Sequence, residues 1–163
     1  MEKWKILKGL EEYFPIYPLP RKVVGSAYDD DELENQRKLQ GKPWNKIDGD
    51  LLEEIGLNYS LLDKEALCYF TPGLFYAGLK EDEHNLLVFG WFRVTFAPRH
   101  RKWRPESIHK IYGSLSLEQL DILKECFLWL GEDEDAFSAE NLKNCLNGIE
   151  ELRKRAVEKS SSV

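Results

Sequence analysis

Apolar residues recur at three- and four-residue steps near the start of the chain. Within residues 3–14 they are Trp4, Leu7, Leu10 and Phe14, a spacing that predicts one apolar face of an α-helix. Three prolines between positions 15 and 20 end this pattern. Residues 29–41 are instead polar, with acidic side chains before basic ones. This order suits the helix dipole, so we expect a second, weakly packed helix there.

The central part of the chain carries two helix-start signals and one ambiguous stretch. Asp63 precedes a run of helix formers, and Thr71 precedes Pro72, a residue that is favoured in the first turn of a helix. The sequence therefore predicts helix starts at both places. Residues 84–98 combine strand-forming residues with apolar pairs at four-residue steps. We favour a helix there because the neighbouring segments are helical, and the alternative is a β-hairpin.

The last third of the chain has the clearest helical pattern. Ser116 and Gln119 have the spacing of a capping box at the start of residues 117–130. That segment has apolar residues on two sides, as in a helix packed between others. Gly131 ends it, and Ser138 is the expected cap of a final helix with one apolar stripe.

Together these patterns predict a mainly α fold. We expect a single compact helical domain spanning residues 1–163, with about six helices built around residues 117–130. A hairpin at 84–98 would make the fold α+β. The polar end of the chain predicts a flexible tail from about residue 158.

Composition and charge narrow the class of protein. The chain has 163 residues, of which 42% are hydrophobic and 32% charged, with a formal net charge of −6. This composition is typical of a globular protein, and the acidity argues against general nucleic-acid binding. No signal peptide and no apolar run of about 20 residues is present. Three dispersed cysteines indicate buried thiols in a reducing compartment. We therefore expect a soluble, cytoplasmic protein without a membrane partner.

No residue pattern points to catalysis, a metal or a cofactor. The three histidines, at 84, 100 and 109, lack the spacing of metal ligands. Cys68 stands among apolar residues, which favours core packing over nucleophilic catalysis. The acidic run at 132–135 fails the EF-hand pattern, and no glycine-rich phosphate loop is present. We expect no enzymatic activity.

The segment 98–105 is basic although the chain is acidic. Its cationic and aromatic residues are Arg99, Arg101, Lys102, Trp103 and Arg104. Such a group can bind phosphates and stack on bases. The simpler interpretation is a solvated loop, and nucleic-acid or phosphate-ligand binding is the alternative function.

The residues from about 43 to 130 carry a resemblance to a protein family. Trp44-x-x-Ile47 is followed by the stretch LDKEALCYFTP at 62–72 and by LSLEQ at 115–119. This order resembles a family of small bacterial proteins of unknown function, in which a tryptophan precedes an L-S-P-E-A-x-x-Y-Y-L-P stretch and an L-S-x-E-Q helix. The chain departs from that pattern at Asp63 and at Phe70–Thr71. The resemblance implies no catalytic residues.

The chain is acidic and rich in aromatic residues, and it has no recognisable group of catalytic residues. These features favour a protein-binding module. Concretely, we expect a bacterial immunity or antitoxin-type protein that inhibits a basic toxin partner. Acidic surfaces accelerate association with such partners. The predicted contact residues are the acids of two clusters, with an exposed tryptophan as anchor: Asp29, Asp30, Asp31 and Glu32, and Asp133, Glu134 and Asp135.

Overall fold

The computed structural model of the protein describes residues 1–97 and 105–161. The described part of the chain is mainly helical and contains no β-strand, so the predicted mainly α fold is confirmed. It forms two compact units. The terminal unit comprises Met1–Phe14 and Phe92–Val163, and the central unit comprises Pro15–Trp91. The prediction of one domain over residues 1–163 stays a prediction.

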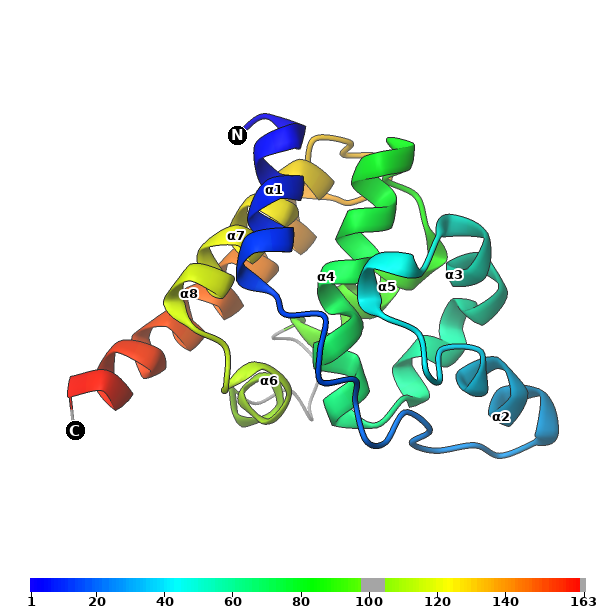
Figure 1. The fold of residues 1–163 in the computed structure, drawn as a ribbon. Helices are drawn as coiled ribbons and strands as arrows, with labels where there is room; N and C mark the ends of the chain where they lie inside the picture. The colour runs from blue at the N-terminus through cyan, green and yellow to red at the C-terminus, as the bar shows by residue number, and fades with distance from the viewer. Residues whose placement is uncertain (98–104, 162–163) are drawn as a thin grey trace. The chain divides into compact units, whose positions relative to one another are not determined.

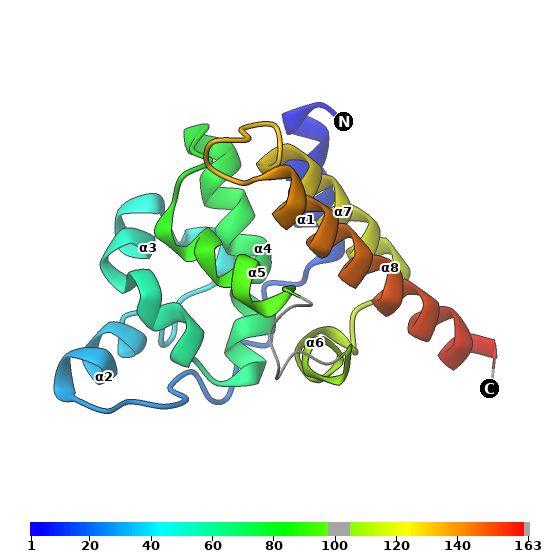
Figure 2. The same cartoon turned by 180° about the vertical axis from the view of Figure 1, so that it is seen from behind.

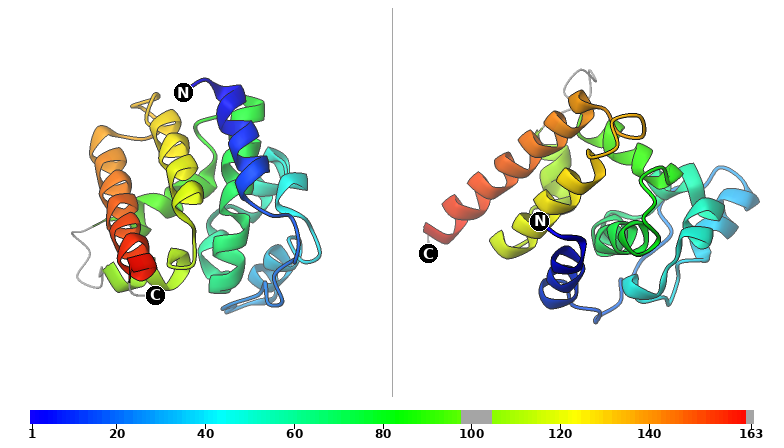
Figure 3. Two further views of the ribbon diagram at one scale, coloured as in Figure 1. Left: turned by 60° about the vertical axis from the view of Figure 1, so that its left-hand side comes forward. Right: turned by 90° about the horizontal axis from the view of Figure 1, so that it is seen from above.

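The terminal unit is built on three long helices and one short helix. They are α1 (Lys3–Tyr13), α6 (Pro105–Tyr112), α7 (Leu117–Leu130) and α8 (Ala139–Ser161). Figure 3 shows α7 between α1 and α8, which explains why it has apolar residues on two sides. The capping box is present: Ser116 Oγ accepts from Gln119 N at 3.1 Å, and Gln119 Oε1 accepts from Ser116 N at 2.9 Å. These two predictions are confirmed.

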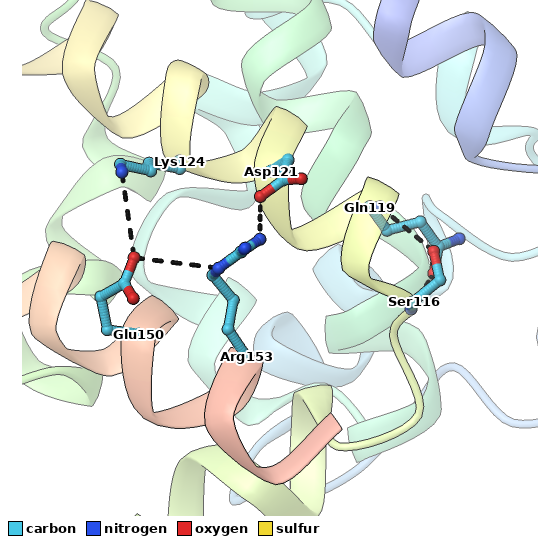
Figure 4. Close-up of polar contacts among 6 residues, drawn as sticks. All are labelled: Ser116, Gln119, Asp121, Lys124, Glu150 and Arg153. Atoms are coloured by element: carbon cyan, nitrogen blue, oxygen red, sulfur yellow. Dashed lines mark hydrogen bonds and ion pairs between the residues drawn. The ribbon is translucent and has the colours of Figure 1, made fainter. Parts of the chain in front are cut away.

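Ion pairs join the polar edges of α7 and α8 (Figure 4). Arg153 of α8 pairs with Asp121 of α7, and its Nε lies 3.9 Å from Glu150. Lys124 Nζ of α7 lies 3.8 Å from the same glutamate. All four side chains are partly exposed, so each pair contributes little stability compared with the apolar seam beneath them. The helix α8 continues to Ser161, and the flexibility of the tail stays a prediction.

The face that α1 buries agrees with the predicted one at Leu10 and Phe14, which are both buried, but not at Trp4. Its buried residues are Ile6, Gly9 and Leu10, whereas Trp4 is 58% exposed. A Cβ atom at Gly9 would collide with Ile122 of α7, so the absence of a side chain there allows α1 to approach α7 closely. This close approach fixes the rotation of α1. Trp4 then falls outside the seam, with its Nε1 donating to Glu2 Oε2 at 2.8 Å.

The central unit surrounds the long helix α4 (Lys64–Glu81). Before α4 come α2 (Asp30–Arg37), η1 (Trp44–Lys46), α3 (Gly49–Ile55) and η2 (Gly56–Leu61), and after it comes η3 (Leu87–Phe89). Figures 1 and 2 show α2 and α3 on the same side of α4. The boundary between the units falls within α5 (Gly90–Thr95). Residues 84–98 therefore contribute η3 and α5 among the described positions, as the favoured helical interpretation predicted.

The prediction that a new helix begins at Thr71 is wrong. The helix α4 runs through this point with Pro72 in its interior. Pro72 has no N–H to donate to the helix ladder, and a proline normally ends a helix for that reason. Here residues 70–75 are all buried, and continuing the helix keeps this apolar run packed. Thr71 Oγ1 donates to Leu67 O at 2.7 Å, which satisfies the hydroxyl inside the core.

An extended segment, residues 15–28, lies along the central unit and is held by polar contacts. Gln36 is fully buried, and its Oε1 accepts from Gly25 N at 2.9 Å while its Nε2 donates to Ser26 O at 2.5 Å. Ser26 N donates to Leu61 O at 2.8 Å. The helix α2, which looked weakly packed, is thus connected to the core through Gln36. Among the helices of the described residues, none has the length and apolar character needed to cross a bilayer.

Candidate functional site

The first predicted acidic cluster lies at the start of α2 in the central unit. Asp29 is the N-cap, and its Oδ1 accepts from Glu32 N at 2.8 Å. Glu32 Oε2 in turn accepts from Tyr28 N at 2.7 Å. These two acids therefore stabilise the helix start, while Asp30 and Asp31 are exposed in its first turn. Their role in partner binding stays a prediction.

The second predicted acidic cluster lies between α7 and α8 in the terminal unit. Asp133 Oδ1 accepts from Asp135 N at 3.1 Å and from Ala136 N at 3.2 Å, which closes the turn. Glu134 and Asp135 are exposed. The two clusters thus belong to different units, and each begins with an aspartate that accepts hydrogen bonds from nearby backbone N–H groups. The predicted anion-binding residues 99–104 lie outside the described residues.

A third acidic feature, which the sequence patterns did not indicate, is a groove in the central unit. It has a volume of about 370 Å³ and joins the start of α3 to the residues that end and follow α4. We call it the acidic groove; its lining residues are Gly49, Asp50, Glu53, Glu81, Glu83, Asn85 and Leu86. Four of these seven lining residues are acidic, and none is a lysine, arginine or histidine.

The start of α3 brings the groove together. Asp48 is the N-cap of α3, and its Oδ1 accepts from Leu51 N at 2.9 Å. Gly49 follows, and its N–H donates to Glu81 Oε1 at 3.2 Å. A Cβ atom at Gly49 would collide with the Glu81 carboxylate. A side chain at position 49 would displace the Glu81 carboxylate, so glycine leaves room for the last residue of α4 beside the first turn of α3.

Backbone N–H groups also orient two other carboxylates of the groove. Glu53 Oε1 accepts from Leu87 N at 3.1 Å, and Glu83 Oε1 accepts from Asn85 N at 2.8 Å. None of the four acids forms an ion pair with another residue of the described chain. The groove is thus a site of accumulated negative charge, and three of its four carboxylates, those of Glu53, Glu81 and Glu83, accept a hydrogen bond from a backbone N–H. Chemically it suits a cationic group such as a lysine or arginine side chain.

Sequence reasoning missed this groove because its acids are far apart in the chain. Asp50 and Glu53 share one face of a short helix, which is an ordinary surface pattern. Glu81 and Glu83 come about thirty residues later, where an acidic helix end gives no sign of a distant neighbour. The only local signal is Gly49 beside the Asp48 cap, and it indicates a close approach without saying of what.

The thiols are poor nucleophiles in this fold. Burial raises the pKa of Cys68 to about 12 and holds the pKa values of Cys126 and Cys145 well above their ordinary range. All three thiols are free, and they pack as small apolar groups. In the described residues no three His, Cys, Asp or Glu side chains are arranged to hold a metal ion.

Comparison of the chain with protein-family models, with curated proteins and with solved structures finds no match. The resemblance to a family of small bacterial proteins stays a prediction.

Proposed function

We propose that this protein is an acidic protein-binding module that captures a basic protein partner, as an immunity or antitoxin-type inhibitor would. The observation that carries the proposal is the acidic groove, which four acidic side chains line and whose described lining includes no lysine or arginine. A net charge of −6 adds a long-range attraction for basic partners.

The expected contribution of the groove follows from its exposure. Each of its four acids is exposed, and one exposed ion pair contributes roughly 0.2–1 kcal/mol to binding or stability. Four such pairs would contribute on the order of 1–4 kcal/mol, less than a tight complex needs. Electrostatic attraction of this kind mainly accelerates association and selects the partner. We infer that further contacts supply the rest of the affinity.

The proposal is tested by capturing partners with the tagged full-length protein from bacterial lysate and identifying them by mass spectrometry. A groove variant replaces its acids by their amides: Asp50→Asn, Glu53→Gln, Glu81→Gln and Glu83→Gln. A matched control neutralises four exposed acids of the terminal unit: Glu118→Gln, Glu132→Gln, Glu140→Gln and Glu158→Gln. Both variants change the net charge equally, so a difference between them reports the groove itself.

We expect one stoichiometric basic protein that the wild type and the control retain and that the groove variant releases at lower salt. Addition of the wild type should also inhibit the activity of that purified partner. A third variant, Asp30→Asn, Asp31→Asn, Glu134→Gln and Asp135→Asn, tests the predicted clusters without removing the capping acids Asp29 and Asp133. If all three variants retain the partner as the wild type does, the acidic surface is not the binding surface.

The same eluate tests the alternative function. Nucleic acid that elutes as the salt concentration rises, with no protein partner, would favour binding through residues 99–104. These residues lie outside the described residues, so no structural observation here favours that alternative.

A further inference from the structure

Two large apolar side chains are exposed beside the acidic groove. Leu57 is 77% exposed and Leu87 is 54% exposed. The groove residue Leu86, directly before Leu87, is in contrast buried. Single exposed leucines are common on protein surfaces and need no explanation. These two differ from such residues because they lie close to an acidic groove.

The two leucines flank the turn that ends α3. Gly56 is the C-cap of α3 with a φ of 48°, and Leu57 follows it directly. A Cβ atom at Gly56 would lie 3.8 Å from Leu87 Cδ1, which places the Leu87 side chain over this turn. The elements that carry the leucines, η2 and η3, are in contact. The Leu87 side chain thus lies beside Gly56, the residue directly before Leu57, and we call these two exposed leucines the leucine pair.

A hydrogen bond joins the leucine pair to the acidic groove. The backbone N–H of Leu87 donates to Glu53 Oε1 at 3.1 Å, and Glu53 lines the groove. An apolar surface thus lies directly beside an anionic one. Protein–protein interfaces often combine an apolar centre with a polar rim.

We propose that the leucine pair and the acidic groove together bind one segment of a partner protein. In that segment an apolar side chain lies within a few residues of a lysine or arginine. This inference rests on the proposed function. The apolar side chain would cover Leu57 and Leu87, and the cation would enter the groove. Charge complementarity selects this occupant. A second copy of the chain packed symmetrically on this surface would place another acidic groove against the first, and like charges repel.

The test is a selection of phage-displayed random peptides on the immobilised full-length protein. The enriched peptides are then synthesised, and their affinities are measured by fluorescence anisotropy. The apolar variant is Leu57→Ser with Leu87→Ser. Its matched control is Leu128→Ser with Val157→Ser, which removes two exposed apolar side chains from the terminal unit. Circular dichroism melting confirms that each variant is folded.

We expect enriched peptides that combine a large apolar residue with a nearby lysine or arginine. The apolar variant should bind them roughly five- to thirtyfold more weakly, the effect of truncating an anchor residue, while the control binds as the wild type does.

Three results would overturn the inference, and they separate it from the proposed function. Basic peptides without an apolar preference, bound equally by the apolar variant, would leave the proposed function standing. No enriched peptide, or enrichment without basic residues, would contradict both. If sedimentation showed that the wild type self-associates and that the apolar variant does not, the occupant would be a second copy of the chain.

Discussion

Replacing Gly73 by alanine tests how closely η1 approaches α4. Gly73 lies inside α4, where alanine is intrinsically better than glycine by about 1 kcal/mol. Helix propensity alone therefore predicts that Gly73→Ala stabilises the protein. The structure predicts the opposite, because a Cβ atom at Gly73 would lie 2.5 Å from Trp44 O and 2.7 Å from Ile47 Cδ1.

The closest atom is a backbone oxygen, so it cannot move aside by rotating a side chain. Two hydrogen bonds also hold Trp44: its N donates to the Tyr69 hydroxyl at 3.2 Å, and its Nε1 donates to Pro15 O at 3.3 Å. Overpacking of this kind costs roughly 1–3 kcal/mol, and we expect a value near the upper end. After the gain in propensity, the net loss is about 1–2 kcal/mol. For a chain of this length that lowers Tm by roughly 2–8 °C.

The assay is thermal and urea unfolding followed by far-UV circular dichroism, with Gly90→Ala as the matched control. Gly90 is the first residue of α5, and a Cβ atom there would meet no other atom within 4 Å. The control should therefore raise Tm slightly. If Gly73→Ala melts at or above the wild-type temperature, the close approach of η1 to α4 is refuted.

Four further tests address other parts of the fold. Gln36→Leu should lower the free energy of unfolding by about 1–3 kcal/mol, because Gly25 N and Ser26 O lose their partner; an unchanged urea midpoint would contradict this. Ser116→Ala removes the capping box and should cost about 1 kcal/mol; an unaltered melting curve would show that the cap contributes nothing. The raised pKa of Cys68 predicts slow reaction with a thiol reagent in the native protein. Because the unfolded thiol loses its proton near pH 9 and the folded one near pH 12, stability should fall as the pH rises through that range; stability that instead rises would contradict the assignment.

Local signals in the sequence identified most helix starts and stops correctly. The capping box at Ser116, the stop at Gly131 and the cap at Ser138 each involve residues within one turn of one another. Such signals depend on a backbone group and a nearby side chain, so the sequence contains all the information they need. Thr71 and Pro72 gave the wrong answer because the apolar run around them is buried on both sides of the proline, which no local pattern reveals.

The sequence by itself therefore determined the helical class of the protein, the position of most helices and its acidic character. Tertiary structure decided that α1 buries Ile6 and leaves Trp4 exposed, because α1 lies close to α7 where Gly9 meets Ile122. It also decided where negative charge accumulates, because the acids that line the groove come from positions about thirty residues apart and Gly49 leaves room for the Glu81 carboxylate. Helix periodicity and capping act within a few residues, whereas a binding surface is made by residues that only the folded chain brings together.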